Sequence, residues 1–261
     1  MLKPREVLLL SVREVAESDL LLSFLSPRAG RFLAVAKGGR RSLRRFVNKL
    51  EAGHLLRVYL RRGRAGLAPI LEAADLLWAP ERVRADPRAF ALAGYFLELA
   101  ERSSPPAEGR EVFPLLLESL RFLEDHGPSG LLAAFFELRL LGLLGWAPEL
   151  SRCLGCGAPL LEGGAFFPEK GGVLCRKCAP EGGRPLSARS LALLQGLRRL
   201  TLAGLSRVKA RPEDLFAVSQ ALRTFLQGVL DQDIKALKVL EALESSGGVH
   251  EARDGGKAVC P

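Results

Sequence analysis

Short apolar runs separated by turn residues fill the first third of the chain and predict β-strands. The runs are residues 7–12, 19–25, 31–37, 54–62 and 66–77. The second and third flank the turn sequence SPRAG at 26–30, which is a hairpin signal. In the fourth run, apolar residues alternate with Arg57, Tyr59 and Arg61, so one strand face should be buried and the other exposed. Five short strands in succession predict a small closed β-barrel.

From Pro80 onward the apolar residues recur at helical spacing. The predicted helices are residues 89–101, 112–124, 129–144, 187–200, 212–230 and 234–243. Pro87 and Pro128 stand where helices should begin. A glycine-rich segment at 151–186 interrupts the helices and carries four clustered cysteines. The pattern predicts a multi-domain chain: a barrel at 1–80, an all-α domain at 81–243 with an insertion at about 151–182, and a disordered tail at 244–261.

The basic charge is concentrated in the barrel segment. The chain has 261 residues, 48% of them hydrophobic, and a net charge of +9, as expected of a basic globular protein. Residues 1–80 contain 15 Lys and Arg against 7 Asp and Glu, a net charge of +8, and the remaining residues have a net charge of +1. This asymmetry indicates a polyanionic partner for the barrel. The nearly neutral helical segment is a poor DNA surface, and we expect it to contact partner proteins.

The sequence indicates neither a membrane protein nor a secreted one. The most apolar stretch, residues 131–146, contains Glu137 and Arg139, whereas a span needs about 20 nearly uncharged residues. The apolar run at 7–10 is short and flanked by charges, unlike a signal peptide. An odd number of cysteines in two close pairs does not suit a disulfide framework. We therefore expect the protein in the cytoplasm, without membrane contact.

The cysteines predict a structural zinc site. They follow the spacing C-x₂-C-x₁₈-C-x₂-C, within the range for four-thiolate zinc fingers. The predicted ligands are Cys153, Cys156, Cys175 and Cys178. Four cysteines fill a tetrahedral coordination sphere and leave no open position for catalysis, so one structural zinc ion per chain is expected. Cys260, in the tail, is not expected to be a ligand.

No catalytic residue is predicted. The three histidines begin the sequences HLL, HGP and HEA, so the H-x-E motif of zinc deaminases is absent. There is no G-x-S-x-G nucleophile elbow, and the glycines at 38 and 39 lack the order of a phosphate-binding P-loop. His54, His126 and His250 are expected to be surface or capping residues. We therefore predict a protein that is not an enzyme.

A basic loop is the second candidate site. The segment KGGRRSLRR has five cations in nine residues, and its glycines let backbone amides approach phosphate. With the outward residues of the fourth strand, the predicted nucleic-acid-binding set is Lys37, Arg40, Arg41, Arg44, Arg45, Arg57, Tyr59, Arg61 and Arg62. Cations gathered this way repel unless a polyanion neutralises them. Two alternatives stay open: a merely solvated basic loop, and a Tyr59 that packs locally instead of stacking on a base.

Several motifs together resemble the bacterial RecO family of recombination and repair proteins. They are ESDLLLSFLS at 17–26, the turn glycine Gly30, AKGGRR at 36–41, and LLGWAPEL at 143–150 leading into C-x-x-C-G. The order of barrel, helices, zinc knuckles and further helices is also similar, to about residue 243. The resemblance implies an OB-fold followed by a helical domain, with the basic loop mapped onto Lys37, Arg40 and Arg41 and the metal ligands onto the four cysteines.

The resemblance also implies a function. RecO-like proteins bind single- and double-stranded DNA, anneal complementary strands, and act with RecR, sometimes RecF, to help RecA load onto DNA covered by single-strand-binding protein. This would place the chain at the nucleoid. Two other classes remain: an RNA-binding, translation-associated zinc protein, which the composition permits equally, and a nuclease, for which no paired carboxylate motif is present in the barrel segment.

Overall fold

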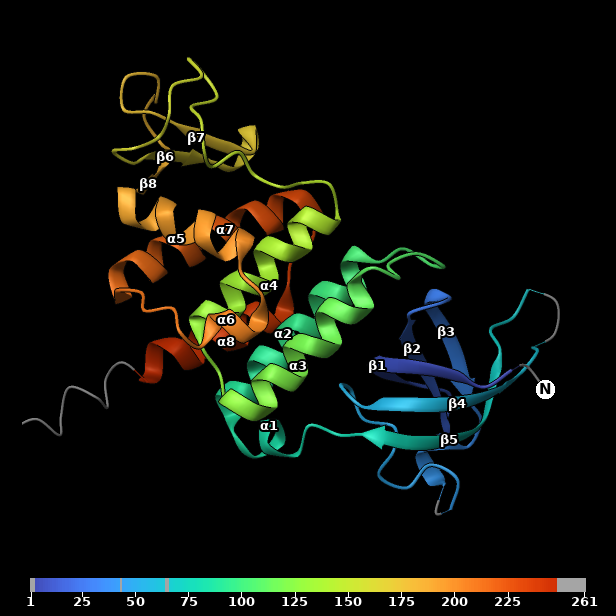
Figure 1. The fold of residues 1–261 in the computed structure, drawn as a ribbon. Coiled ribbons are helices and arrows are strands. Elements are labelled where there is room, and N and C mark those ends of the chain that lie inside the picture. Colours follow the sequence, from blue (N-terminus) through green and yellow to red (C-terminus); the bar gives the residue numbers. More distant parts are fainter. Residues whose placement is uncertain (1–2, 43, 64–65, 248–261) are drawn as a thin grey trace, which may run out of the picture.

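A closed five-stranded barrel forms the N-terminal part of the computed structural model, which describes residues 3–42, 44–63 and 66–247 (Figure 1). The strands are β1 (Arg5–Val15), β2 (Asp19–Ser26), β3 (Gly30–Ala36), β4 (Leu55–Arg61) and β5 (Ile70–Trp78). Their order is β1-β2-β3-β5-β4, with β3 and β5 parallel and the other pairs antiparallel. This confirms the predicted barrel and gives it the OB-like arrangement.

The side chains of β4 alternate between the barrel core and the solvent, as the sequence predicts. Leu56, Val58 and Leu60 are buried in the barrel core, whereas Arg57 and Arg61 are exposed. A short 3₁₀ helix, η1 (Gly39–Arg41), follows β3. Gly38 precedes it with a φ of 62°, a left-handed conformation that favours glycine, and its N–H donates to the Asp19 carboxylate at 2.8 Å. The basic loop therefore leaves the barrel in a defined conformation.

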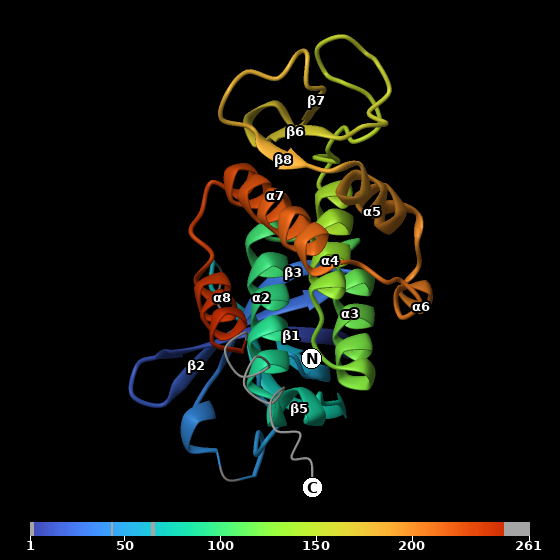
Figure 2. The ribbon, with the colours of Figure 1, turned by 90° about the vertical axis from the view of Figure 1, so that its left-hand side faces the viewer.

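Eight helices follow the barrel in the part of the chain that the structure describes (Figures 1 and 2). They are α1 (Glu81–Ala85), α2 (Pro87–Ser103), α3 (Val112–His126), α4 (Gly130–Leu143), α5 (Ala188–Arg199), α6 (Leu202–Leu205), α7 (Pro212–Leu230) and α8 (Lys235–Gly247). The side chain of Asp86 caps α2 just before Pro87, and that of Ser129 caps α4. The central helix α4 packs against α3, α5 and α7. None of the described helices is long and apolar enough to cross a membrane.

The cysteine-bearing insertion contains a small sheet that the sequence analysis did not predict. Its strands are β6 (Gly164–Phe167), β7 (Gly172–Leu174) and β8 (Arg184–Leu186), in the order β7-β6-β8, with η2 (Pro168–Lys170) between β6 and β7. The insertion lies at the end of the helical domain remote from the barrel (Figures 1 and 2). Phe166 packs edge-on against Phe225 of α7, with 5.6 Å between ring centroids, which seats the sheet on the helices.

Two expectations about single regions need correction. Residues 244–247, assigned to the tail, form the end of α8, where the Glu244 carboxylate accepts two hydrogen bonds of 2.9 Å from Arg223. Residues 248–261, with His250 and Cys260, lie outside the described residues. His54 is buried rather than at the surface, and its Nδ1 lies 2.9 Å from the Lys49 carbonyl oxygen.

A buried charged cluster joins four helices. Arg223 of α7 is 5% exposed and Glu137 of α4 is fully buried, with 3.7 Å between the guanidinium Nε and the carboxylate. Tyr95 of α2 donates its hydroxyl to Glu137 at 2.8 Å, and Glu244 of α8 pairs with Arg223. Burial raises the pKa of Glu137 to about 7, against the attraction of Arg223 and the Tyr95 hydrogen bond.

This cluster makes a pH-dependent prediction. A carboxyl group with a raised pKa in the folded state lowers the free energy of unfolding as pH rises from about 4.5 to about 7. Because glutamine does not titrate, the free energy of unfolding of Glu137→Gln, taken relative to that of the wild type, should rise by about 2 kcal/mol from pH 5 to pH 8. Urea unfolding at both pH values measures this difference. Glu118→Gln, on the exposed face of α3, is the control, and equal pH dependence of wild type and Glu137→Gln would contradict the assignment.

Candidate metal centre and nucleic-acid interface

The four predicted cysteine ligands converge. Cys153 and Cys156 lie in the loop after α4, and Cys175 and Cys178 lie in the turn after β7. Their four sulfur atoms all lie within 4.8 Å of one another, and the Cys156 and Cys175 sulfurs are 3.8 Å apart. That distance is far longer than a disulfide bond of about 2 Å. The four thiols are free and could together hold one metal ion.

The backbone around the cluster favours thiolate. The Cys175 N–H donates to the Cys153 sulfur at 3.2 Å, and the Gly155 N–H donates to the same sulfur at 3.4 Å. Backbone donors, that of Cys175 foremost, lower the pKa of Cys153 to about 6. In contrast, hydrogen bonds to the neighbouring sulfurs of Cys156 and Cys175 raise the pKa of Cys178 to about 12. The four sulfurs would therefore be ionised together only with a cation among them.

Gly155 lies close to the opposing cysteine pair. A Cβ atom on Gly155 would lie 3.1 Å from the Cys178 Cβ and 3.3 Å from its sulfur. A side chain there would require Cys178 to shift by a few tenths of an ångström. The glycine in the turn C-L-G-C therefore leaves room for Cys178 of the second pair. The spacing of the cysteines in the sequence does not show this contact.

The basic loop after β3 is exposed. Lys37, Arg41 and Arg44 are exposed, and no described carboxylate lies within 4.0 Å of them. Arg45 donates to the Lys37 carbonyl oxygen at 2.8 Å and its guanidinium lies 5.0 Å from the Phe46 ring centroid. Because Phe46 is buried in the barrel, this contact anchors the loop while leaving its cations at the surface. Arg40 differs, since it pairs with Glu14 at 2.9 Å.

The outer face of β4 is less basic than its sequence suggests. Arg57 lies directly across from Asp75 of β5, and Arg61 pairs with Glu72 at 2.7 Å. Tyr59 donates its hydroxyl to Asp75 at 3.0 Å, a bond that raises the pKa of the phenol. The predicted cations of this face are therefore partly neutralised. Arg62, just past the strand, is exposed and has no described carboxylate within 4.0 Å.

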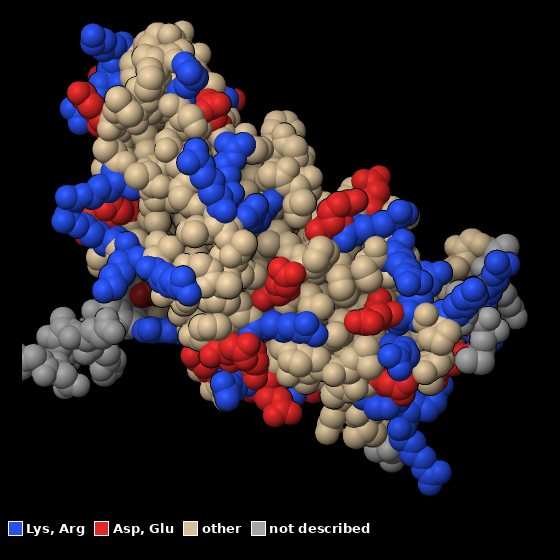
Figure 3. All heavy atoms as spheres, viewed as in Figure 1, with Lys and Arg blue, Asp and Glu red and all other residues tan. Residues whose placement is uncertain are grey.

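The nine predicted DNA-binding residues thus fall into two groups, five in the loop after β3 and four on or just past β4. Lys and Arg side chains cover much of the barrel surface in Figure 3, with acidic side chains between them. The acidic partners Glu14, Glu72 and Asp75 were not placed by sequence reasoning, because strand register decides which charges become neighbours.

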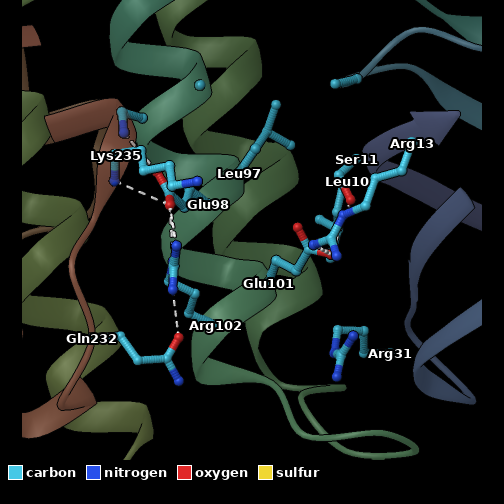
Figure 4. Close-up of a pocket in the computed structure, with 13 residues that line it drawn as sticks. Leu10, Ser11, Arg13, Arg31, Leu97, Glu98, Glu101, Arg102, Gln232 and Lys235 are labelled. Atoms are coloured by element: carbon cyan, nitrogen blue, oxygen red, sulfur yellow. Dashed lines mark hydrogen bonds and ion pairs between the residues drawn. The ribbon is translucent and has the colours of Figure 1, made fainter. Parts of the chain in front are cut away.

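A cleft of about 850 Å³ separates the barrel from the helices (Figure 4). Glu101 of α2 spans it, accepting from Ser11 at 2.9 Å and pairing with Arg13 at 3.6 Å. Glu98 faces α8, and although burial opposes its charge, the N–H groups of Ala236 and Lys235 together with Arg102 lower the pKa of Glu98. Glu101 thus joins the helical domain to the barrel, whereas Glu98 joins α2 to the start of α8 within the helical domain.

The loop between α2 and α3 completes this junction. The Arg31 N–H donates to Glu108 and the Ala107 N–H donates to Arg31, both at 2.7 Å, and the Arg31 side chain donates to the Ser104 carbonyl. Gly30 has a φ of 66°, and a Cβ there would collide with the Glu108 carbonyl oxygen. The turn glycine noted in the sequence is therefore required by the contact between domains as well as by the hairpin.

Comparison with known proteins covers nearly the whole described chain. Residues 1–76 match the family model for the N-terminal part of recombination protein O, and residues 84–238 match the model for its C-terminal part. DNA repair protein RecO of Syntrophus aciditrophicus is 30% identical over 250 residues, covering 93% of this chain and 96% of that protein. The RecO protein of Desulforudis audaxviator is 37% identical over 207 residues, covering 78% and 81%.

The protein of the same name from Frankia casuarinae is 33% identical over 241 residues, covering 90% of this chain and 97% of that protein. Both family models lie in the expected order, the first on the barrel and the second on the helices and the cysteine insertion. The resemblance inferred from the sequence motifs is confirmed, and the chain belongs to the RecO family.

Proposed function

We propose that this protein is a DNA repair mediator that binds single- and double-stranded DNA and anneals complementary strands. The observation that carries the proposal is the loop after β3, where Lys37, Arg41, Arg44 and Arg45 are exposed without carboxylate partners among the described residues. Contacts from such groups to phosphate carry no base information, so binding should be nearly independent of sequence. Arg40, Arg57, Arg61, Arg62 and Tyr59 extend the surface, with smaller effects where acidic groups oppose them.

We further propose that the cysteine cluster holds one structural zinc ion. A tetrahedron with zinc–sulfur bonds of about 2.3 Å separates the sulfurs by about 3.8 Å, which fits the spacing of the Cys156 and Cys175 sulfurs. Four thiolates leave no position for water or substrate, so bound zinc would stabilise the fold of the insertion. The protein would act without catalysis, by holding strands and partners.

The helical domain would contact the partner proteins. On family grounds these partners are RecR, single-strand-binding protein and, in some bacteria, RecF, and the outcome of their joint action is RecA loading. This division assigns DNA to residues 1–80 and protein partners to residues 81–243. On the same family grounds, we propose that the protein acts in the cytoplasm, in association with the nucleoid. A pull-down of the full chain with purified RecR, with and without DNA, tests the partner assignment.

Annealing is the activity that tests the proposal most directly. Two polyanionic strands meet when a cationic surface screens their repulsion, so the protein should accelerate annealing of complementary oligonucleotides at 50 mM salt and lose most of this effect at several-fold higher salt. Fluorescence transfer between labelled strands measures the rate. Tighter binding to single-stranded RNA than to DNA would favour the translation-associated alternative. Strand breaks in DNA incubated with the protein and magnesium would favour the nuclease alternative.

A further inference from the structure

The connection between β4 and β5 lies at the end of the barrel remote from the helices (Figure 1). Residues of this connection line a small cavity together with Arg5 and Phe32. Its volume is about 300 Å³, at the lower end of the range for small-molecule sites. The walls include Arg5, Phe32, Leu60, Arg62, Leu67 and Pro69. Barrel ends are common ligand sites, because core side chains become accessible there without loss of the sheet.

The floor of the cavity is aromatic and apolar. Phe32 is the third residue of β3 and is half-buried, with its ring centroid 5.5 Å from that of the fully buried Phe24. Leu60 is 1% exposed and belongs to the barrel core, whereas Leu67 at the rim is 67% exposed. The core thus fixes the Phe32 ring from behind and leaves part of it facing the cavity. An exposed leucine beside an accessible ring offers apolar contact on two sides of a flat ligand.

The rim is cationic and unneutralised. The Arg5 guanidinium lies 5.6 Å from the Phe32 ring centroid. Arg62 also lines the cavity and lies just past the end of β4, in the connection to β5. Neither arginine has a carboxylate oxygen within 4.0 Å among the described residues, and the cavity lining contains no Asp or Glu. The adjacent Arg61, by contrast, is held by Glu72. No described carboxylate neutralises these two guanidinium groups, so they can bind an anion.

We propose that this cavity receives one unpaired base of a DNA strand, held against Phe32 and the Arg5 guanidinium that lies over its ring, while Arg62 binds a flanking phosphate. The inference rests on the proposed DNA binding and adds a base-contacting site to the phosphate-contacting loop. Every base has a stacking face, so the site would tolerate any sequence. A base within a duplex is already stacked and paired, so the cavity would favour single-stranded over double-stranded DNA.

The experiment compares three DNA ligands of equal length: a single strand, the same strand with abasic residues, and a duplex. We expect Phe32→Leu, which keeps an apolar side chain but removes the ring, to weaken binding of the normal strand roughly 5- to 100-fold. Binding of the abasic strand and the duplex should be unchanged, and the salt slope should be preserved because no phosphate contact is lost. Phe90→Leu, which changes a phenylalanine of α2 that is 62% exposed, is the matched control.

A second variant guards against misfolding of the first. Leu67→Asp changes an exposed residue that lines the cavity and places a carboxylate there, so it should weaken single-strand binding by a similar factor. Leu161→Asp, at an 81% exposed leucine of the cysteine insertion, is its control. Equal losses of affinity for the normal and abasic strands, or unchanged binding by a folded Leu67→Asp, would contradict the proposed base-binding site and leave the proposed DNA binding intact. A wild-type protein that binds no DNA would overturn the proposed function with it.

Discussion

Changing Arg40, Arg41, Arg44 and Arg45 together to alanine is expected to flatten the salt dependence of single-stranded DNA binding by about three units if all four residues contact phosphate, and by about two units if Arg40 stays paired with Glu14. Each phosphate contact on a single strand contributes about −0.7 to the slope of log K against log salt, because neutralised phosphates release counterions. At 0.1 M salt the affinity should fall by about 1,000-fold for a change of three units and by about 100-fold for a change of two units. Titration by fluorescence anisotropy at four or five salt concentrations measures both quantities, and the annealing rate should fall in parallel.

The structure supplies a control for this variant. Arg57 and Arg61 lie beside Asp75 and Glu72, so the double change to alanine removes cations that are already partly neutralised and should alter the slope far less. Thermal unfolding of both variants should match the wild type, since the loop side chains are exposed. An unchanged affinity and slope for the quadruple variant, or a larger effect from the double variant, would show that the loop is not the main DNA-binding surface.

Cys153→Ser is expected to have the largest effect on stability. The wild type should contain one equivalent of zinc, and loss of the buried Cys153 thiolate leaves three sulfur ligands and a weaker site. Because binding of a structural metal contributes directly to folding, we expect the insertion to be destabilised by on the order of 4 kcal/mol or more. Metal analysis, thiol titration and limited proteolysis of residues 151–186 measure the three consequences.

The control is Cys260→Ser, which lies outside the described residues and should leave zinc content unchanged. DNA binding by Cys153→Ser should also be largely retained, since the insertion lies at the far end of the helical domain from the barrel (Figure 1). Wild-type protein purified without chelator that has no metal and four reactive thiols in the cluster would contradict the site. A change in zinc content with Cys260→Ser would contradict the choice of ligands.

Local pattern was sufficient to predict most of the elements. The alternation at 55–61 defines a half-buried strand whatever its neighbours are, because side chains in a strand point to opposite faces. Pro87 and Ser129 lie at the starts of α2 and α4, where unpaired N–H groups need a cap or a missing donor. The small sheet of the insertion was missed because its strands have three or four residues, too few for a periodic signal.

The cysteine cluster was predictable for a related reason. Each C-x-x-C pair brings its own two sulfurs together in a local turn, so only the meeting of two pairs depended on the tertiary structure. The basic loop was equally visible, since five cations within nine residues share a surface in any conformation. For both sites the sequence by itself determined which residues take part.

What the tertiary structure decided is which charges meet. Strand register placed Asp75 and Glu72 beside Arg57 and Arg61, residues that are more than ten positions apart along the chain. Barrel closure brought Arg5 and Arg62 around Phe32, and helix packing buried Glu137 against Arg223. Electrostatic energy depends on distances and burial in space, and these are set by long-range contacts that no local pattern contains. The sequence therefore identified the cations of this protein, and the fold determined which of them remain free to bind.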